Sequence, residues 1–401
     1  MTGASRPLVV LVAPDSFKGS LTSVEVARAL ATGWASARPT DEILLAPLAD
    51  GGEGTTVAIA AAGGWEWRTT TVHDPDFHDV DARWLISPDG RRAIIELAAA
   101  SGLSLVPVAQ RATTIHTTMG TGELLVAALD AGVREITLGI GGSATTDGGA
   151  GILTVLGAVF RDEAGRPLVE LPTPPVPAVL GGVATADLGG LDPRLAEVHL
   201  RIACDVTNPL LGTNGAAAVY GPQKGASPDD IAFLDGNLET YADALEAATG
   251  RHERDTPGAG AAGGTGFGLL CLTDRFASLK LVPGIDVVMS AADFDGKLGR
   301  ADLVITGEGR IDAQTAFGKT ALGVARRAAA AGIACIAVGG GVEAAGIEAL
   351  RPLGAVVVPV VERPQTVEQA MAAGPEPLVR CGARLARLVD LGRVIGASSG
   401  P

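Results

Sequence analysis

Residues 8–20 read LVVLVAPDSFKGS, and this stretch decides the fold. Its first six residues form a continuous apolar run rich in branched side chains, which predicts a strand buried on both faces of a parallel sheet. The helix that follows is expected to begin near Thr22 or Ser23, because both residue types are good N-caps. A second strand at 43–46 and an alanine-rich helix at 55–62 complete a βαβα unit.

The C-terminal part of the chain shows the same alternation of apolar strands and amphipathic helices. Strands are expected at 302–306, 333–338 and 355–360, with helices at 319–331 and near 343–351. The strand at 333–338 is followed by three glycines. Alternating strands and helices predict a parallel sheet covered by helices.

The segment 65–98 differs from both chain ends, because it contains three extended stretches and no helix between them. This pattern is typical of an antiparallel meander. The stretches are at 65–72, 80–86 and 93–97.

The sequence therefore predicts an α/β protein of two α/β domains. Residues 1–74 and 288–401 are expected to form one Rossmann-like parallel-sheet domain from both chain ends, and residues 75–287 an inserted second α/β domain. We expect the active site in the cleft between the two domains.

Composition excludes several classes of protein. The chain has 401 residues, 31 basic and 45 acidic, and a net charge of −14, so nucleic acid and anionic membranes are disfavoured partners. Aromatic residues make up only 3%, which argues against a surface that stacks bases. Four separated cysteines without a CxxC pair, and no apolar run long enough to span a bilayer, predict a cytoplasmic protein. The sequence leaves a homodimer open.

Polar residues gather just after four of the predicted strands, where doubly wound folds bind their ligands. The first such loop, 14–20, carries Asp15, Ser16 and Lys18. Asp15 and Ser16 could simply form a turn, but a lysine beside a glycine favours phosphate binding.

The second segment, DGGEGT at 50–55, carries Asp50 and Glu53. Two carboxylates three residues apart could bind Mg²⁺ or orient a hydroxyl group. The alternative is that Glu53 only complements the dipole of the following helix.

The third segment, GIGGSATTDGGAG at 139–151, follows a strand predicted at 135–138. A glycine loop that opens a helix offers free N–H groups to an anion, so phosphate binding is favoured over tight helix packing. The candidate residues are Gly141, Gly142, Ser143, Thr145 and Asp147.

The fourth segment, TGEGRID at 306–312, is expected as a loop after the strand at 302–306. Glu308 and Asp312 are candidate metal ligands, and Arg310 could pair with a carboxylate or phosphate in a bidentate manner.

Two further motifs give weaker evidence of function. GAGAAG at 258–263 fits the dinucleotide fingerprint but does not follow a strand, which disfavours an NAD-linked oxidoreductase. AQTAFGKT at 313–320 fits only a relaxed phosphate-loop pattern and lies too far from its strand, although Lys319 could still reach a phosphate. The five histidines form no zinc motif, and no GxSxG motif is present. A further alternative is a non-catalytic sensor that binds a nucleotide or a small acid without turnover. The several charged groups on these loops disfavour it, because such a sensor would need few of them.

Taken together, the segments resemble the bacterial type of the glycerate kinase family, distinct from the plant and archaeal types. The matching strings follow the family's order over nearly the whole chain. They are APDSFKGSLTSVEVARAL (13–30), PLADGGEGT (47–55), LAAASGLSLVP (97–107), GTGELLVAAL (120–129), GIGGSATTDGGAG (139–151), ACDVTNPLLG (203–212), GPQKGA (221–226), PGAGAAGG (257–264) and ITGEGRIDAQTAFGK (305–319).

The resemblance implies Mg²⁺-dependent phosphorylation of D-glycerate by ATP, with 2-phosphoglycerate as the expected product. Transfer to the 3-hydroxyl, or a related small hydroxy acid as substrate, is the alternative. The chain departs from the family pattern at 74–78, where relatives tend to have a Gly-Pro-Leu-Gly-like turn, and at Met119, where relatives often have Arg or Tyr.

Phosphoryl transfer needs a phosphate cradle, cations and a base near the acceptor hydroxyl, and the candidate residues divide among these roles. Asp15, Lys18, Asp50 and Asp205 are catalytic candidates, and Asp50 and Asp205 compete for the general base. The expected phosphate or nucleotide contacts are Gly141, Gly142, Ser143, Thr145, Asp147 and Lys319. Substrate contacts are expected from Ser16, Lys224 and Arg310, and metal contacts from Glu53, Glu308 and Asp312.

Overall fold

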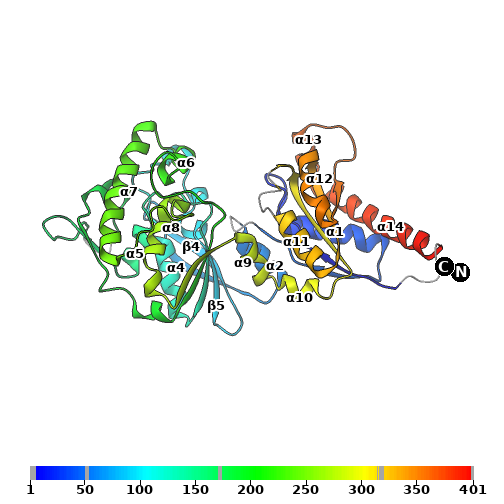
Figure 1. The fold of residues 1–401 in the computed structure, drawn as a ribbon, viewed down its shortest axis with the longest axis horizontal. Helices are drawn as coiled ribbons and strands as arrows, with labels where there is room; N and C mark the ends of the chain where they lie inside the picture. The colour runs from blue at the N-terminus through cyan, green and yellow to red at the C-terminus, as the bar shows by residue number, and fades with distance from the viewer. Residues whose placement is uncertain (1–5, 50–53, 170–173, 314, 316–319, 399–401) are drawn as a thin grey trace. The chain divides into compact units, whose positions relative to one another are not determined.

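The computed structural model describes residues 6–49, 54–169, 174–313, 315 and 320–398 (Figure 1). The chain divides into two compact units. The first consists of Met1–Asp50, Val57–Gly63 and Ile285–Pro401, and the second of Gly51–Thr56 and Gly64–Gly284. Each unit is an α/β structure built on its own sheet, and each is described separately below.

The first unit contains a parallel five-stranded sheet made from both chain ends, in the order β13-β12-β11-β1-β2. The strands are β1 (Val9–Val12), β2 (Glu42–Leu45), β11 (Leu303–Ile311), β12 (Ala334–Val342) and β13 (Val356–Pro359). The parallel sheet from both chain ends is thus confirmed. The sheet is parallel because helices connect its strands, and it is apolar because helices cover it.

The helices of this unit begin with α1 (Ser23–Ala37), whose N-cap is Thr22. The Thr22 hydroxyl accepts a hydrogen bond from the Glu25 amide, and the Glu25 carboxylate accepts one from the Thr22 amide. This capping box confirms the predicted start of the helix. The other helices are α2 (Thr55–Ala62) and α9 (Gly284–Ala291), which both begin where the chain passes between the units, α10 (Phe294–Leu298), α11 (Thr320–Ala331), α12 (Ala344–Leu350), α13 (Val367–Ala372) and α14 (Glu376–Ser398).

The C-terminal helix α14 packs directly against α1, as the red and blue helices of Figure 1 show. The contact is close because glycines lie at the crossing. A Cβ atom on Gly33 would be 1.9 Å from the Val379 carbonyl oxygen, and one on Gly382 would be 2.3 Å from the Leu30 carbonyl oxygen. Residues near the two ends of the chain therefore share one apolar core.

Two strands of this sheet are longer than the sequence predicts. The fourth polar segment is not a loop, because β11 continues through Glu308 and Arg310 to Ile311, and β12 includes the glycines at 339–341. The two strands stay paired there, with Glu308 opposite Gly339. The glycines, which looked like a turn signal, instead let neighbouring backbones approach: a Cβ on Gly340 would be 2.6 Å from the Gly309 carbonyl oxygen.

The second unit contains a mixed six-stranded sheet in the order β10-β9-β6-β5-β4-β3. Strands β3 to β5 are antiparallel to one another, as the meander pattern predicts, and β5, β6, β9 and β10 are parallel. The strands are β3 (Glu66–His73), β4 (Asp79–Ile86), β5 (Arg92–Glu96), β6 (Glu135–Gly139), β9 (His199–Ala203) and β10 (Ser278–Val282). A small antiparallel pair, β7 (Val159–Arg161) and β8 (Thr185–Asp187), lies apart from this sheet.

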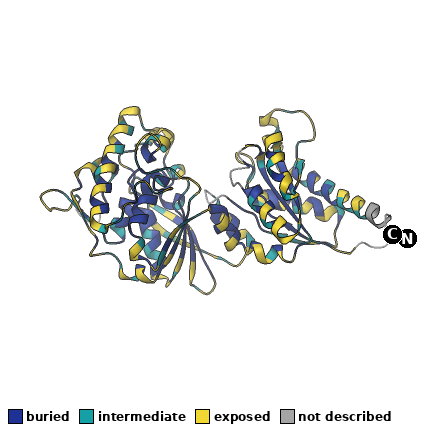
Figure 2. Cartoon of the chain, in the orientation of Figure 1, coloured by how far each residue is buried: buried dark blue, intermediate teal, exposed yellow. Residues whose placement is uncertain are grey.

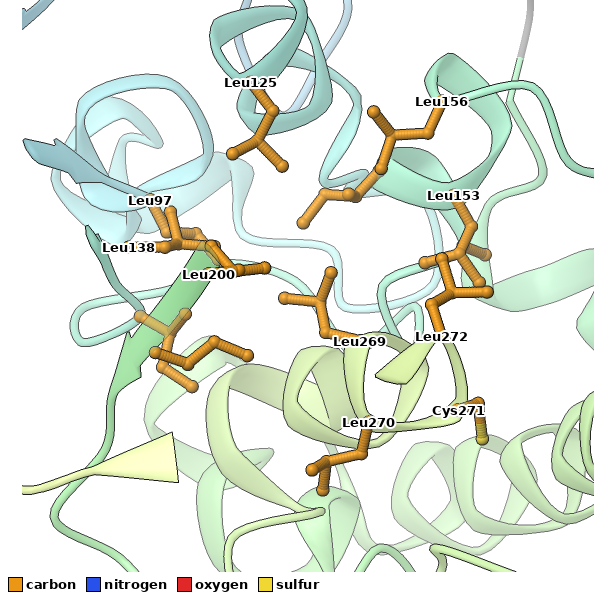
Figure 3. Packing of buried hydrophobic residues seen from close by; sticks show 14 of the residues in the cluster. Leu97, Leu125, Leu138, Leu153, Leu156, Leu200, Leu269, Leu270, Cys271 and Leu272 are labelled. Atoms are coloured by element: carbon orange, nitrogen blue, oxygen red, sulfur yellow. The ribbon is translucent and has the colours of Figure 1, made fainter. Parts of the chain in front are cut away.

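The helices of the second unit pack on this sheet around a core of leucines (Figure 3). They are α3 (Ala98–Ser101), α4 (Met119–Asp130), α5 (Ala150–Val155), α6 (Ala216–Tyr220), α7 (Pro228–Thr249) and α8 (Ala261–Cys271). Tyr241 of α7 is fully buried, and its ring lies 5.3 Å from that of Phe160 and 6.0 Å from that of Phe267. Figure 2 shows exposed and buried faces on the same helices, and the outer strand β3 is mostly exposed or half-buried.

The cysteines are free thiols, and Cys271, Cys335 and Cys381 are buried. Among the residues that the structure describes, no helix is both long and apolar enough to cross a membrane.

Candidate active site

The glycine-rich segment 139–151 joins β6 to α5 in the second unit and is held by backbone hydrogen bonds. The Leu103 amide donates to the Gly142 carbonyl over 2.8 Å, and the Ala144 amide donates to the Ser101 carbonyl over 2.9 Å. Gly142 has a φ of +75°, in the left-handed region that favours glycine. The loop is therefore a fixed structure, and Gly142 is needed for its turn.

Lys224 reaches this loop from the short 3₁₀ turn η5 (Pro222–Lys224). Its side chain is buried, with 2% of the residue exposed, and Nζ donates to the Ser143 hydroxyl over 2.9 Å and to the Thr145 carbonyl over 2.5 Å. An ammonium group has three N–H donors, so these two acceptors leave capacity for a further one. Burial lowers the pKa of Lys224 to about 7, against the attraction of Asp147.

Asp147 lies deeper in the same loop. Its carboxylate accepts hydrogen bonds from the Thr118 amide at 2.8 Å, the Thr118 hydroxyl at 2.7 Å, the Gly149 amide at 3.1 Å and the Gly151 amide at 3.2 Å. Burial raises the pKa of this carboxyl group despite the four donors. These contacts fasten the start of α5 to the segment before α4, so the structure places Asp147 as an anchor of the loop.

Two threonine hydroxyl groups of the same loop have no hydrogen-bond partner among the described residues. They belong to Thr145 and Thr146, and both residues are buried. Buried polar groups in native proteins are nearly always paired, so unpaired ones need an explanation. They belong to the loop whose Thr145 carbonyl accepts from the Lys224 ammonium group, so Lys224, Thr145 and Thr146 form a polar cluster in the sense that all three lie in or contact one loop.

Asp205 follows β9 in the same unit. Asp205 is exposed, and its Oδ1 accepts a hydrogen bond of 3.0 Å from the Gly284 amide at the start of α9. This hydrogen bond orients the carboxylate in a solvent-accessible position.

In the first unit, Asp15 follows β1 and is buried. One carboxylate oxygen accepts from the Ser16 amide over 2.6 Å, and the other accepts from the Thr320 hydroxyl at the start of α11 over 2.6 Å. The Asp15 amide also donates to the Gly307 carbonyl over 2.7 Å. The first and fourth polar segments of the sequence therefore meet at the carboxyl end of this sheet.

Lys18 lies in the same loop and is exposed. The loop passes over β11 at Gly309, where a Cβ atom would be 3.2 Å from the Cα of Phe17 and 3.4 Å from the Lys18 amide. Glycine at this position lets the loop lie on the strand.

Glu308 and Arg310 are in β11 and are placed differently. Glu308 is buried, and its Oε1 accepts a hydrogen bond of 2.8 Å from the Thr315 hydroxyl. Arg310 is exposed; its Nε lies 3.1 Å from Oε1 of Glu343 and 3.5 Å from Oδ2 of Asp312. Glu343 raises the pKa of this guanidinium group.

The remaining candidates are Asp50, Glu53 and Lys319, which lie outside the described residues. Within the described ranges, no group of three or more His, Cys, Asp and Glu side chains gathers in a way that could hold a metal ion.

The structure adds residues that the sequence analysis did not single out. Thr118 binds Asp147, Thr146 carries an unpaired hydroxyl, and Thr320 binds Asp15. Thr320 is the last residue of the string AQTAFGKT, so a signal was present there. For Thr118 no signal was available, because its partner is distant in the sequence.

Comparison with known proteins places this geometry in a family. The model of the glycerate kinase family matches residues 10–390. A protein named glycerate kinase from Bacillus subtilis (strain 168) is 47% identical over 333 residues, which are 83% of this chain and 85% of that protein. Glycerate 2-kinase from Escherichia coli (strain K12) is 45% identical over 316 residues, which are 79% of this chain and 81% of that protein.

A solved structure gives the same result for the fold. A crystal structure of a protein assigned as glycerate kinase 2 from Salmonella typhimurium LT2 has a TM-score of 0.83 and 42% sequence identity. The match covers 97% of this chain and 100% of the Salmonella chain. The chain belongs to the glycerate kinase family.

Proposed function

We propose that this protein transfers the γ-phosphoryl group of ATP to the 2-hydroxyl of D-glycerate and forms 2-phosphoglycerate and ADP. The observation that carries the proposal is the buried Lys224, held at a glycine-rich loop in a chain of the glycerate kinase family. The name of the E. coli relative, glycerate 2-kinase, supports the choice of hydroxyl.

In this reaction the acceptor oxygen forms a bond to the γ-phosphorus, and the bond between that phosphorus and the oxygen bridging to the β-phosphate breaks. The electron pair of the broken bond leaves with ADP, and the hydroxyl proton passes to a base. The protein has little covalent chemistry to perform. Its contribution is to position the two substrates and to stabilise the negative charge.

The cluster around Lys224 would bind the anionic part of a substrate. Its ammonium group attracts a carboxylate or a phosphoryl oxygen, and the unpaired hydroxyls of Thr145 and Thr146 can donate hydrogen bonds to the same ligand. Ser143 holds the ammonium group at the loop. In this proposal Gly141 and Gly142 supply backbone that a phosphate can approach closely.

The base is proposed to be Asp205 or Asp50. Asp205 is exposed, and its Oδ1 accepts a hydrogen bond from the Gly284 amide, so the carboxylate is oriented at a position that solvent and substrate can reach. Lys18 and Asp15 of the first unit are proposed to act on the phosphoryl donor. Asp15 would do so from a rigid position, since both of its oxygens are hydrogen-bonded.

Mg²⁺ is usually bound by one or two carboxylates together with substrate phosphates, so two carboxylates of the first unit would suffice to hold it. Glu308 is a buried carboxylate with a hydroxyl partner, and Asp312 lies close by in sequence. These two residues are proposed to hold the ion, which would neutralise charge on the phosphates; Glu53, which lies outside the described residues, stays a candidate from the sequence alone. ATP is the proposed donor.

A panel of acids tests the proposal. Purified protein is mixed with MgATP and D-glycerate, L-glycerate, lactate or 3-hydroxypropanoate, and ADP release is followed. We expect the fastest release with D-glycerate. Omission of the divalent ion should abolish the release. Absence of ADP release with D-glycerate would contradict the proposed function, and faster release with another acid would change the substrate.

A further inference from the structure

The glycine motif PGAGAAGG at 257–264 has no role in the reaction proposed above. It follows α7 and runs into the start of α8. Three consecutive residues in it have left-handed backbone, because φ is +53° at Ala262, +67° at Gly263 and +89° at Gly264. Left-handed backbone is usually limited to single residues, so a run of three needs an explanation. Such backbone persists where the surrounding structure enforces it, and it is often found at functional sites.

This left-handed turn at 262–264 lies directly on the glycine-rich loop of the candidate site. The Gly148 amide donates to the Gly263 carbonyl over 3.0 Å. A Cβ atom on Gly263 would be 2.0 Å from the Thr145 carbonyl oxygen and 2.7 Å from the Cα of Thr146. Both neighbours are backbone atoms, so they cannot give way as the end of a flexible side chain can. Only glycine lets the turn lie this close to the loop.

The Thr145 carbonyl oxygen is also the atom that binds Lys224. It accepts a hydrogen bond of 2.5 Å from Nζ of Lys224, and the Ser143 hydroxyl accepts the other one, of 2.9 Å. The same oxygen therefore lies against Gly263 and holds the ammonium group. A displacement of this oxygen would take one of these two acceptors away from Lys224.

The turn is itself held in place, so it can act as a support. The Thr265 hydroxyl donates to the Ala262 carbonyl over 2.9 Å, which closes the turn. Before the turn, the Gly260 amide donates to the Asn208 carbonyl over 2.9 Å, in the loop that follows β9. A Cβ atom on Gly260 would be 2.2 Å from the Pro209 carbonyl oxygen, so that contact is close as well.

We propose that Gly263 is a positioning residue: the left-handed turn at 262–264 fixes the Thr145 carbonyl and so keeps the Lys224 ammonium group in the geometry used for phosphoryl transfer. This inference rests on the proposed function. It gives the motif that resembles a dinucleotide fingerprint a part in the reaction without direct contact with the reacting atoms.

The test compares alanine substitutions at two glycines of similar backbone conformation. Gly250, at the end of α7, has a φ of +73°, and a Cβ atom there would meet no atom of the described residues within 4 Å. Gly263→Ala and Gly250→Ala both place alanine in left-handed backbone, so both should lower Tm. Only Gly263→Ala also displaces the Thr145 carbonyl. We expect its kcat/KM for D-glycerate to fall roughly 10- to 100-fold, as when a catalytic group is misplaced, and that of Gly250→Ala to equal wild type.

Two further comparisons separate positioning from a general loss of structure. The double variant of Gly263→Ala and Lys224→Met should be no less active than Lys224→Met alone, because both substitutions act through the same ammonium group. Thr265→Val keeps the shape of the side chain but removes the hydrogen bond to Ala262. It should lower kcat/KM by a smaller factor than Gly263→Ala, and Thr265→Ser, which keeps the hydroxyl, should recover the loss.

Titration of the Lys224 side chain gives a readout that needs no turnover. Burial lowers the pKa of Lys224 to about 7, and Asp147 is the charged group that acts against this shift. In protein with isotope-labelled lysine, NMR should place the Lys224 midpoint at lower pH in Gly263→Ala than in wild type, because an acceptor of the charged form is lost. Gly250→Ala should keep the wild-type midpoint.

Several outcomes would overturn the inference. An unchanged kcat/KM in Gly263→Ala would do so, as would equal losses in the two alanine variants or additive losses in the double variant. If Gly263→Ala does not fold, a wild-type kcat/KM in folded Thr265→Val would have the same meaning. Failure of the proposed function is separate, because it appears as wild-type protein that releases no ADP with D-glycerate. In that case the NMR midpoint decides, and a midpoint unchanged in folded Gly263→Ala or Thr265→Val would contradict the inference.

Discussion

Lys224 has two neighbours that determine where its ammonium group lies, the Ser143 hydroxyl at 2.9 Å and the Thr145 carbonyl at 2.5 Å. A buried lysine in a protein of net charge −14 gives anionic substrates a local cation that the overall charge does not. The residue is therefore more than a packing element, because methionine would fill the same space without the desolvation of a charge.

Replacement of this lysine tests its role directly. Lys224→Met keeps the length of the side chain and removes the charge, so we expect kcat/KM for D-glycerate to fall roughly 10²- to 10³-fold, as on loss of one charge-stabilising donor. Lys280→Met, at an exposed lysine of β10, is the control and should keep wild-type activity. A loss of less than roughly twofold in Lys224→Met would remove this residue from the reaction.

The pH dependence of the reaction should report the same group. Burial lowers the pKa of Lys224 to about 7, so the ammonium form is lost as pH rises through that value. If the ammonium group binds substrate, kcat/KM of the free enzyme should fall on the alkaline side of pH 7. The measurement is kcat/KM against pH with the coupling enzymes in excess. A profile that stays level from pH 6 to roughly pH 9 would contradict this assignment.

The contribution of Lys224 to the free energy of unfolding should become more favourable as pH rises, whereas its contribution to activity is lost. The folded-state pKa of about 7 is below the ordinary value of 10.5, so between these values the unfolded chain binds a proton that the folded chain has released. The destabilisation by Lys224 is full below pH 7 and disappears as pH rises toward 10.5. In urea unfolding, Lys224→Met should therefore gain most over wild type below pH 7, and an equal gain near pH 10 would contradict the sign.

At the scale of elements, the contact between α1 and α14 depends on glycine. A Cβ atom on Gly382 would be 2.3 Å from the Leu30 carbonyl oxygen, whereas a Cβ on Gly392 of the same helix would meet no atom within 4 Å. Gly382→Ala should lower the free energy of unfolding by about 1–3 kcal/mol, the usual range for overpacking. Gly392→Ala should leave it unchanged or raise it slightly, because alanine favours the helix. Equal effects of the two substitutions on the urea midpoint would contradict this packing.

The elements also show what the sequence could and could not predict. The helix start at Thr22 and the meander of β3 to β5 were predictable, because capping residues and alternating polarity act locally. The full length of β11 and β12 was not, because glycines at 339–341 look like a turn until the neighbouring strand is known.

The candidate site was also predictable only in part. The glycine-rich loop and Lys224 could be found from residue types and from the family strings. The anchoring of Asp147 by Thr118 joins segments distant in sequence, so no local pattern reveals it.

At the scale of the whole molecule, each of the two units carries part of the candidate chemistry. The first presents Asp15, Lys18 and Glu308 near the carboxyl end of a parallel sheet, and the second presents Lys224 and Asp205. The cleft expected between two domains, their boundaries and the oligomeric state stay predictions.

The central claim is transfer of a phosphoryl group to the 2-hydroxyl of D-glycerate, and one coupled assay tests it most directly. Purified protein with MgATP and D-glycerate is coupled to enolase, with phosphoglycerate mutase left out. Enolase accepts only the 2-phosphate, so the account predicts that phosphoenolpyruvate appears at once. Phosphoenolpyruvate that appears only after mutase is added would mean transfer to the 3-hydroxyl, and no product in either case would contradict the claim altogether.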